Sequence, residues 1–174
     1  HVQGKNLLEA LGDPLSLANA LERLSTLAQS RGDLDQAWAQ QSRRLSLVKK
    51  SDNKNQIADV LVDLGNIAAA KEDYTEAEKL FDEGLGIYKE LENQGSMAYV
   101  LGLKSRVLLK AGKVTEGHAL LKERIELERE YGDQSTVLSA LVDLASMEED
   151  QGELDESYSR YRDALELSVN LGDL

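Results

Sequence analysis

The chain has 174 residues, of which 41% are hydrophobic and 30% charged, and its formal net charge is −12. This composition is typical of a globular protein, and no apolar run of about 18 residues indicates a membrane span. The acidic balance argues against a general surface for nucleic acid or anionic lipid, and the absence of Cys excludes disulfides and cysteine-ligated metals.

Similar residues recur 40 positions apart along the whole chain. Apolar residues make up two such sets, which are Leu21, Leu61, Leu101 and Leu141, and Leu45, Leu85, Ile125 and Leu165. Small residues make up two more, which are Ser25, Gly65, Ser105 and Ala145, and Ala37, Ala77, Gly117 and Ser157. Each period holds two stretches with helical spacing and a short break between them, so the sequence predicts repeated antiparallel helix pairs.

The first full period shows how each helix pair begins and ends. We expect a helix from about Pro14 to Ser30, because proline suits a first helical turn. Gly32 ends this segment, and Asp33 with Gln36 three residues later forms a capping-box pattern for the second helix. Gly112 and Gly152 take the place of Gly32 in later periods, whereas the second period has Glu72 there.

The repeats divide the chain into regular segments. The full repeats are expected at residues 12–51, 52–91, 92–131 and 132–171, within a single domain. Residues 1–11 are expected to be the second half of an earlier helix pair, and residues 172–174 the start of a further one. Such ends without polar caps predict a fragment of a longer array that can self-associate end to end; the alternative is a complete protein with atypical terminal repeats.

The helix patterns resemble the tetratricopeptide repeat family. First helices carry Leu61 followed by Leu64-Gly65, and second helices carry a small residue with a bulky one four positions later, such as Ala77 and Phe81. The 40-residue period and Leu64-Gly65-Asn66 resemble kinesin light chains, Leu-Gly-Asn-rich polarity adaptors and the sensor arms of bacterial signalling NTPases. The resemblance implies an all-α, right-handed solenoid of helix-turn-helix repeats.

Some positions depart from the repeat pattern. Lys104 stands where other repeats have Leu, and we expect its stem to lie on apolar neighbours with the ammonium group in water; the alternative is a charge placed in a groove. Gln41 replaces a bulky residue, and Glu148 replaces Ala or Leu. The adjacent Glu148, Glu149 and Asp150 are expected to be solvated rather than catalytic. Trp38 is expected to pack at a hairpin.

The resemblance also implies an interaction groove lined by the first helix of each repeat. Its candidate residues are Asn19, Glu22, Arg23, Asp59, Asp63, Asn66, Tyr99, Leu103, Arg106, Lys110, Asp143 and Ser146. Further positions on the same helix faces include Val62 and Gly102. Acidic groups predominate in the second and fourth repeats, and apolar groups with Arg106 beside them in the third. This surface favours a protein or peptide partner with apolar and basic residues.

Catalysis has little support in the sequence. His118 lies on a second helix without another histidine or a carboxylate cluster nearby, and no phosphate-binding or nucleophile motif is present. We therefore expect no enzyme activity, cofactor or metal, and no nucleic-acid or membrane partner. The predicted function is a cytoplasmic scaffold that binds protein or peptide; the alternative is a sensor or regulatory arm of a multidomain signalling NTPase or transcription regulator.

Overall fold

The structure, a computed structural model, describes residues 14–171, and every regular element within them is helical. The first helices of the repeats, here called A helices, are α2 (Pro14–Ser30), α4 (Lys54–Ala70), α6 (Gln94–Lys110) and α8 (Gln134–Asp150). The second, or B, helices are α3 (Leu34–Val48), α5 (Tyr74–Glu90), α7 (Val114–Tyr131) and α9 (Leu154–Leu171). A 3-10 turn, Lys49–Ser51, follows α3. The predictions for residues 1–11 and 172–174 lie outside the described residues.

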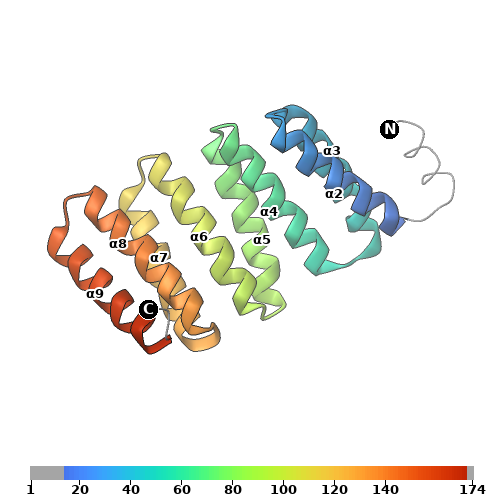
Figure 1. Ribbon diagram of the computed structural model, residues 1–174. Coiled ribbons are helices and arrows are strands. Elements are labelled where there is room, and N and C mark those ends of the chain that lie inside the picture. Colours follow the sequence, from blue (N-terminus) through green and yellow to red (C-terminus); the bar gives the residue numbers. More distant parts are fainter. Residues whose placement is uncertain (1–13, 172–174) are drawn as a thin grey trace. The chain divides into compact units, whose positions relative to one another are not determined.

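Each A helix packs against the B helix that follows it, so the repeating element is a helical hairpin (Figure 1). The expected turn chemistry is present in the first hairpin, where Gly32 has a φ of 76° and the Asp33 carboxylate accepts a 3.0 Å hydrogen bond from the Gln36 N–H. In the second hairpin Glu72 adopts the same left-handed backbone, with a φ of 62°. The all-α prediction is therefore confirmed.

The chain divides into two compact units, His1–Leu91 and Glu92–Leu174, and the division falls at the boundary expected between the second and third repeats. Within the described residues, the first unit contains α2 to α5 and the second contains α6 to α9. The single-domain organisation and the repeat boundaries remain predictions. Each unit is described by itself below.

The core of the first unit depends on a close approach between α4 and α5. Phe81 of α5 is fully buried, and its ring lies over Gly65 of α4. A Cβ atom at Gly65 would lie only 2.6 Å from the ring carbon Cε1, so this position requires glycine while Phe81 is present. Trp38 packs with Leu34 against Ala28, Ala37 and Ile67, which confirms its expected packing role.

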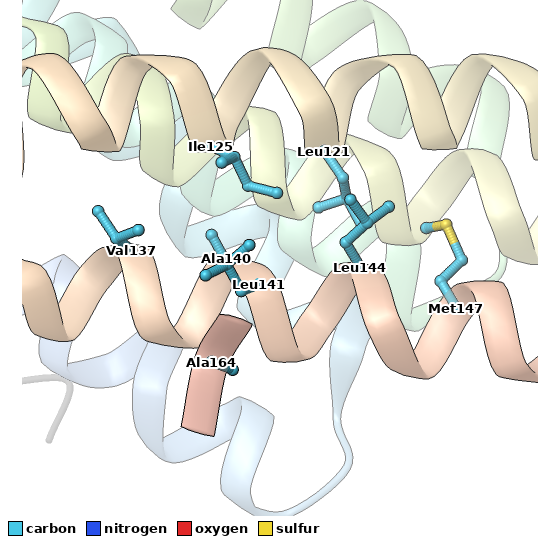
Figure 2. Packing of buried hydrophobic residues seen from close by; sticks show 8 residues of the cluster. All are labelled: Leu121, Ile125, Val137, Ala140, Leu141, Leu144, Met147 and Ala164. Carbon is cyan, nitrogen blue, oxygen red and sulfur yellow. The ribbon is translucent and has the colours of Figure 1, made fainter. Parts of the chain in front are cut away.

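In the second unit, the core joins α7 to the next A helix, α8 (Figure 2). Leu121 and Ile125 of α7 pack against an apolar stripe of α8 made of Val137, Ala140, Leu141, Leu144 and Met147. Ala164 of α9 completes the cluster. The B helix α7 thus packs against both the A helix of its own repeat, α6, and the A helix of the next one, α8.

The expectation that Glu148 is solvated was wrong. Its side chain is buried, with Oε1 3.8 Å from Nε of Arg160, and its Oε2 has no hydrogen-bond partner. The reason is its register, since Glu148 occupies the core column that holds Ala28, Ala68 and Leu108 in the other repeats. Glu149 and Asp150 are exposed, as expected.

Candidate functional site

In the first unit, one arginine joins the candidate residues of two repeats. Arg44 of α3 is buried, and its Nη2 lies 2.9 Å from Glu22 Oε2 on α2 while its Nη1 lies 3.2 Å from Asp63 Oδ2 on α4. The buried Gln41 donates a further hydrogen bond of 3.1 Å from Nε2 to the same Asp63 oxygen. We call these four residues the Arg44 cluster.

The surroundings of Asp63 change its acidity. Burial of the carboxyl raises its pKa from 3.8 to about 6; the Arg44 guanidinium opposes this, the negative charges of Glu22 and Asp59 add to it, and the Gln41 hydrogen bond opposes it. The side chain is still 39% exposed, so solvent screens part of the effect on stability.

This raised pKa predicts a pH dependence. Between pH about 4 and 6 the folded state retains a proton on Asp63 that the unfolded chain has released, so the contribution of Asp63 to the free energy of unfolding falls as pH rises through that window. Carbon NMR titration of the Asp63 carboxyl should show a midpoint near 6. The stability of wild type relative to Asp63→Asn should decrease over the same range, and a midpoint at or below the ordinary value would contradict the assignment.

The remaining candidate residues of the first unit lie on α2 and α4. Asp59 is exposed and accepts a 2.5 Å hydrogen bond from the hydroxyl of Tyr88, which comes from α5. Asn66 is half-buried on α4. Asn19, Glu22 and Arg23 line one hollow beside α2, so the predicted residues of the first repeat do lie together.

In the second unit, a cavity of about 440 Å³ lies among α6, α7 and α8. Three of the predicted groove residues, Arg106, Asp143 and Ser146, line it together. Its apolar lining comes from Leu109, Val114, Leu121 and Met147, and the remaining lining residues are Gly102, Ser105, Asp150 and Gln151. We call this space the α6–α8 groove. Tyr99, Leu103 and Lys110 also lie on α6 but do not line it.

A second arginine stands beside this groove. Nη1 of Arg124, on α7, lies 2.6 Å from Asp143 Oδ2 on α8. The guanidinium also covers Gly102 of α6, where a Cβ atom would lie 3.0 Å from Nη1. Gly102, at the edge of the groove lining, is therefore buried beneath an arginine of a B helix, and Val62, the matching position on α4, is buried as well.

Sequence reasoning missed Arg44 and Arg124 because it assigned the groove to A helices alone. A signal was available, since the two arginines are 80 residues apart and each precedes its aspartate partner by 19 residues. The intermediate repeat has Gly84 in place of the arginine. Within residues 14–171, an ion pair of this kind therefore starts from the B helices of the first and third repeats and not from that of the second.

The described residues offer little for acid–base or metal chemistry. Nδ1 of His118 lies 4.0 Å from Glu153 Oε2, and its buried Nε2 has no hydrogen-bond partner. Between residues 14 and 171, no group of histidine and carboxylate side chains is arranged to hold a metal ion. The same part of the chain has no helix both long and apolar enough to cross a membrane.

Comparison with known proteins agrees with this architecture. Residues 16–90 match the tetratricopeptide repeat family model. No curated protein sequence matches the chain. Together with the solved structures described next, the family match confirms the resemblance, and the chain carries tetratricopeptide-like repeats, a fold that is generally a non-catalytic, protein-binding scaffold.

Three solved structures illustrate the similarity of the fold. A putative kinesin light chain with TPR-like repeats from Podosopora anserina is 13% identical, with a TM-score of 0.82 over 99% of this chain and 85% of its own. A Rap protein complexed with competence and sporulation factor is 14% identical, with a TM-score of 0.80 over 95% of this chain and 46% of its own. A STAND protein from Pyrococcus horikoshii with a tetratricopeptide repeat sensor is 13% identical, with a TM-score of 0.74 over 94% of this chain and 25% of its own.

Proposed function

We propose that the chain is a non-catalytic module that binds a protein or peptide through its A helices. The observation that carries the proposal is the α6–α8 groove, where three of the predicted groove residues share one cavity with an apolar lining. Sites that bind peptides combine an apolar pocket with a few polar groups that set orientation. The Rap protein similar in fold is complexed with competence and sporulation factor, which supports a binding role for this kind of array.

The groove favours a partner with an apolar side chain next to a basic one. Leu109, Leu121 and Met147 offer apolar contact to an inserted side chain. Asp143 and Asp150 are exposed carboxylates on the same cavity, and Asp143 is held in place by Arg124. A cationic residue of the partner would gain from these charges, and the net charge of −12 would speed its approach.

A peptide library displayed on phage tests this proposal. Selection against the whole chain should enrich sequences that pair an apolar residue with Lys or Arg. The affinity of a selected peptide, measured by fluorescence anisotropy, should fall at least about tenfold in Asp150→Lys, which corresponds to about 1.4 kcal/mol. Ser146→Trp should also weaken binding, because the indole would fill the cavity.

The matched control is Asp155→Lys, which makes the same charge change on an exposed residue of α9 outside the groove. It should leave the affinity within about twofold of wild type, and circular dichroism should show that all variants keep their helix content. Equal losses in Asp150→Lys and Asp155→Lys would indicate only long-range attraction. If the enriched peptides bind the Ser146→Trp variant as tightly as they bind wild type, the groove is not the binding site.

A second candidate function is a sensor or regulatory arm in a larger signalling protein. The similarity to the tetratricopeptide repeat sensor of the STAND protein favours it, although the chain spans only 25% of that protein. In such an arm the same groove would bind the signal, and binding would alter an effector domain. The full-length sequence distinguishes the two, because a nucleotide-binding or DNA-binding domain in it would support the sensor arm.

A further inference from the structure

The second unit holds another cavity, of about 360 Å³, where the end of α7, the turn before α8 and the second half of α9 meet. Its apolar lining comes from Val137 and Leu141 of α8 and Leu167 of α9. Leu167 also packs against the core that joins α7 to α8, so the cavity lies on the side of α9 that faces these two helices. Its volume is within the range of small-molecule sites. We call this space the Glu128 pocket, after the residue described next.

A buried carboxylate lines this pocket. Glu128 of α7 is only 7% exposed, and it stands in the column where the first two repeats have the buried Val48 and Tyr88. Among the described residues its carboxylate accepts no hydrogen bond, and its ion pair is with Arg124, whose Nε lies 3.7 Å from Oε1. Gly132 leaves the other oxygen uncovered, because a Cβ atom at that position would overlap Oε2 of Glu128.

The carboxylate of Glu128 is short of positive charge. Nη1 of Arg124 lies 2.6 Å from Asp143 Oδ2, and its Nε has no hydrogen-bond partner, so one guanidinium is shared between two carboxylates. A buried carboxylate is costly unless a cation or a hydrogen-bond donor reaches it. A charged residue in a column that holds buried uncharged residues elsewhere is expected at a site with a function. The placement of Glu128 therefore points to a ligand that completes its interactions.

The rest of the pocket is acidic as well. Asp133 and Glu166 line it as exposed carboxylates, and Asp163 lines it as a half-buried one. Arg129 is the cationic side chain of the described lining, and its Nη1 lies 3.0 Å from Oε1 of Glu126, which is outside the lining. Within residues 14–171 the carboxylates form no group that could hold a metal ion, so this charge favours an organic cation.

We propose that the Glu128 pocket binds a guanidinium or ammonium group carried on an aliphatic stem. The apolar lining would contact the stem, while Glu128 and the acidic rim face the cation. A guanidinium should bind more tightly than an ammonium, since it is more weakly hydrated and donates to several carboxylate oxygens at once. The same chemistry occurs in an Arg or Lys side chain of a partner and in a free alkylguanidine or alkylamine. The pocket shares no described lining residue with the α6–α8 groove, so this inference does not rest on the proposed function.

Butylguanidinium chloride tests the pocket directly. It is titrated into the isotope-labelled whole chain at constant ionic strength, replacing sodium chloride as it is added. We expect saturable amide shifts in residues 128–134 and 163–167, a dissociation constant below roughly 10 mM, and weaker binding of butylammonium chloride. The absence of shifts in these residues at roughly 50 mM probe would overturn the proposal.

Glu128→Gln removes the charge and keeps the size of the side chain. It should weaken binding at least about tenfold, because a charge-assisted hydrogen bond is lost. The matched control is Glu123→Gln, which removes the same charge from an exposed residue of α7 outside the pocket and should leave the affinity within about twofold of wild type. Equal losses in both variants would indicate only long-range attraction and would overturn the proposal. Glu166→Lys, at the exposed rim, should also weaken binding, and it decides the matter if circular dichroism shows that Glu128→Gln loses helix content.

A capped arginine distinguishes the two sources of the cation. N-acetyl-arginine amide presents the side chain as a partner protein would, without the charges of the free amino acid. If it binds within about threefold of butylguanidinium, the pocket takes an arginine side chain of a partner. If it binds at least about tenfold more weakly while butylguanidinium still binds, the pocket takes a free small molecule. Both results support the pocket, whereas binding of both probes that Glu128→Gln and Glu166→Lys leave unchanged would overturn it.

Discussion

Phe81→Ala is expected to lower the free energy of unfolding of the first unit by about 3–5 kcal/mol, the usual range for removing a buried aromatic ring. Phe81 is completely buried in the folded chain, with 0% of its surface accessible to solvent, and its ring packs directly over Gly65. Trp38 is the only tryptophan and belongs to the first unit, so its fluorescence during denaturation reports this loss separately from the second unit. A loss below about 1 kcal/mol would contradict tight packing at this position.

Gly65 provides the control for this packing. In the wild-type background, Gly65→Ala should cost about 1–3 kcal/mol, because its Cβ would overlap the Phe81 ring. In a Phe81→Leu background the same change should be neutral or gain up to about 1 kcal/mol, because alanine favours the helix. The second unit already combines Ser105 with Leu121 at these register positions. Equal effects in both backgrounds would show that overlap with the ring is not the cause.

Arg44→Met is expected to lower the free energy of unfolding of the first unit by about 2–3 kcal/mol at pH 7. Methionine keeps much of the buried stem but removes the charge that faces Glu22 and Asp63. Breaking a fully buried ion pair costs about 3–5 kcal/mol, and the partial exposure of both carboxylates places the expected loss below that range. Denaturation followed by Trp38 fluorescence measures the change.

Adding Asp63→Asn to Arg44→Met should recover part of this loss, because it removes one of the carboxylates left without a counter-charge. Arg31→Met is the matched control, since Arg31 is exposed just after α2, and it should change stability by less than about 0.5 kcal/mol. If Arg44→Met and Arg31→Met have the same small effect, the Arg44 cluster does not stabilise the fold.

The architecture was predictable because its signals are local and repeated. The helix expected from Pro14 to Ser30 has those bounds in the structure, and Asp33 caps the next helix as its spacing predicted. Each such signal depends on neighbouring residues along the chain, and the repeats provide the same signal several times. The burial of Leu21 and its counterparts follows from the same periodicity.

The candidate site was predictable only in part, because its contacts join residues distant in sequence. Arg106, Asp143 and Ser146 were expected on A helices and do share the α6–α8 groove. The ion pair of Asp143 was not expected, since its partner Arg124 reaches over from a B helix. The burial of Glu148 was missed for a related reason. It was expected to be solvated because it is charged, although the matching positions in the other repeats hold buried apolar residues.

The alternation of the arginine–aspartate pairs has a consequence for changes in repeat number. Arg44 meets Asp63, and Arg124 meets Asp143, across junctions that are 80 residues apart. Removing or duplicating 80 residues therefore keeps an arginine 19 residues before each aspartate at the new junction. Removing or duplicating 40 residues can instead place Gly84 or Ala164 at the position of that arginine. By this criterion the electrostatic period of the described chain is two repeats, twice the period of its helical hairpins.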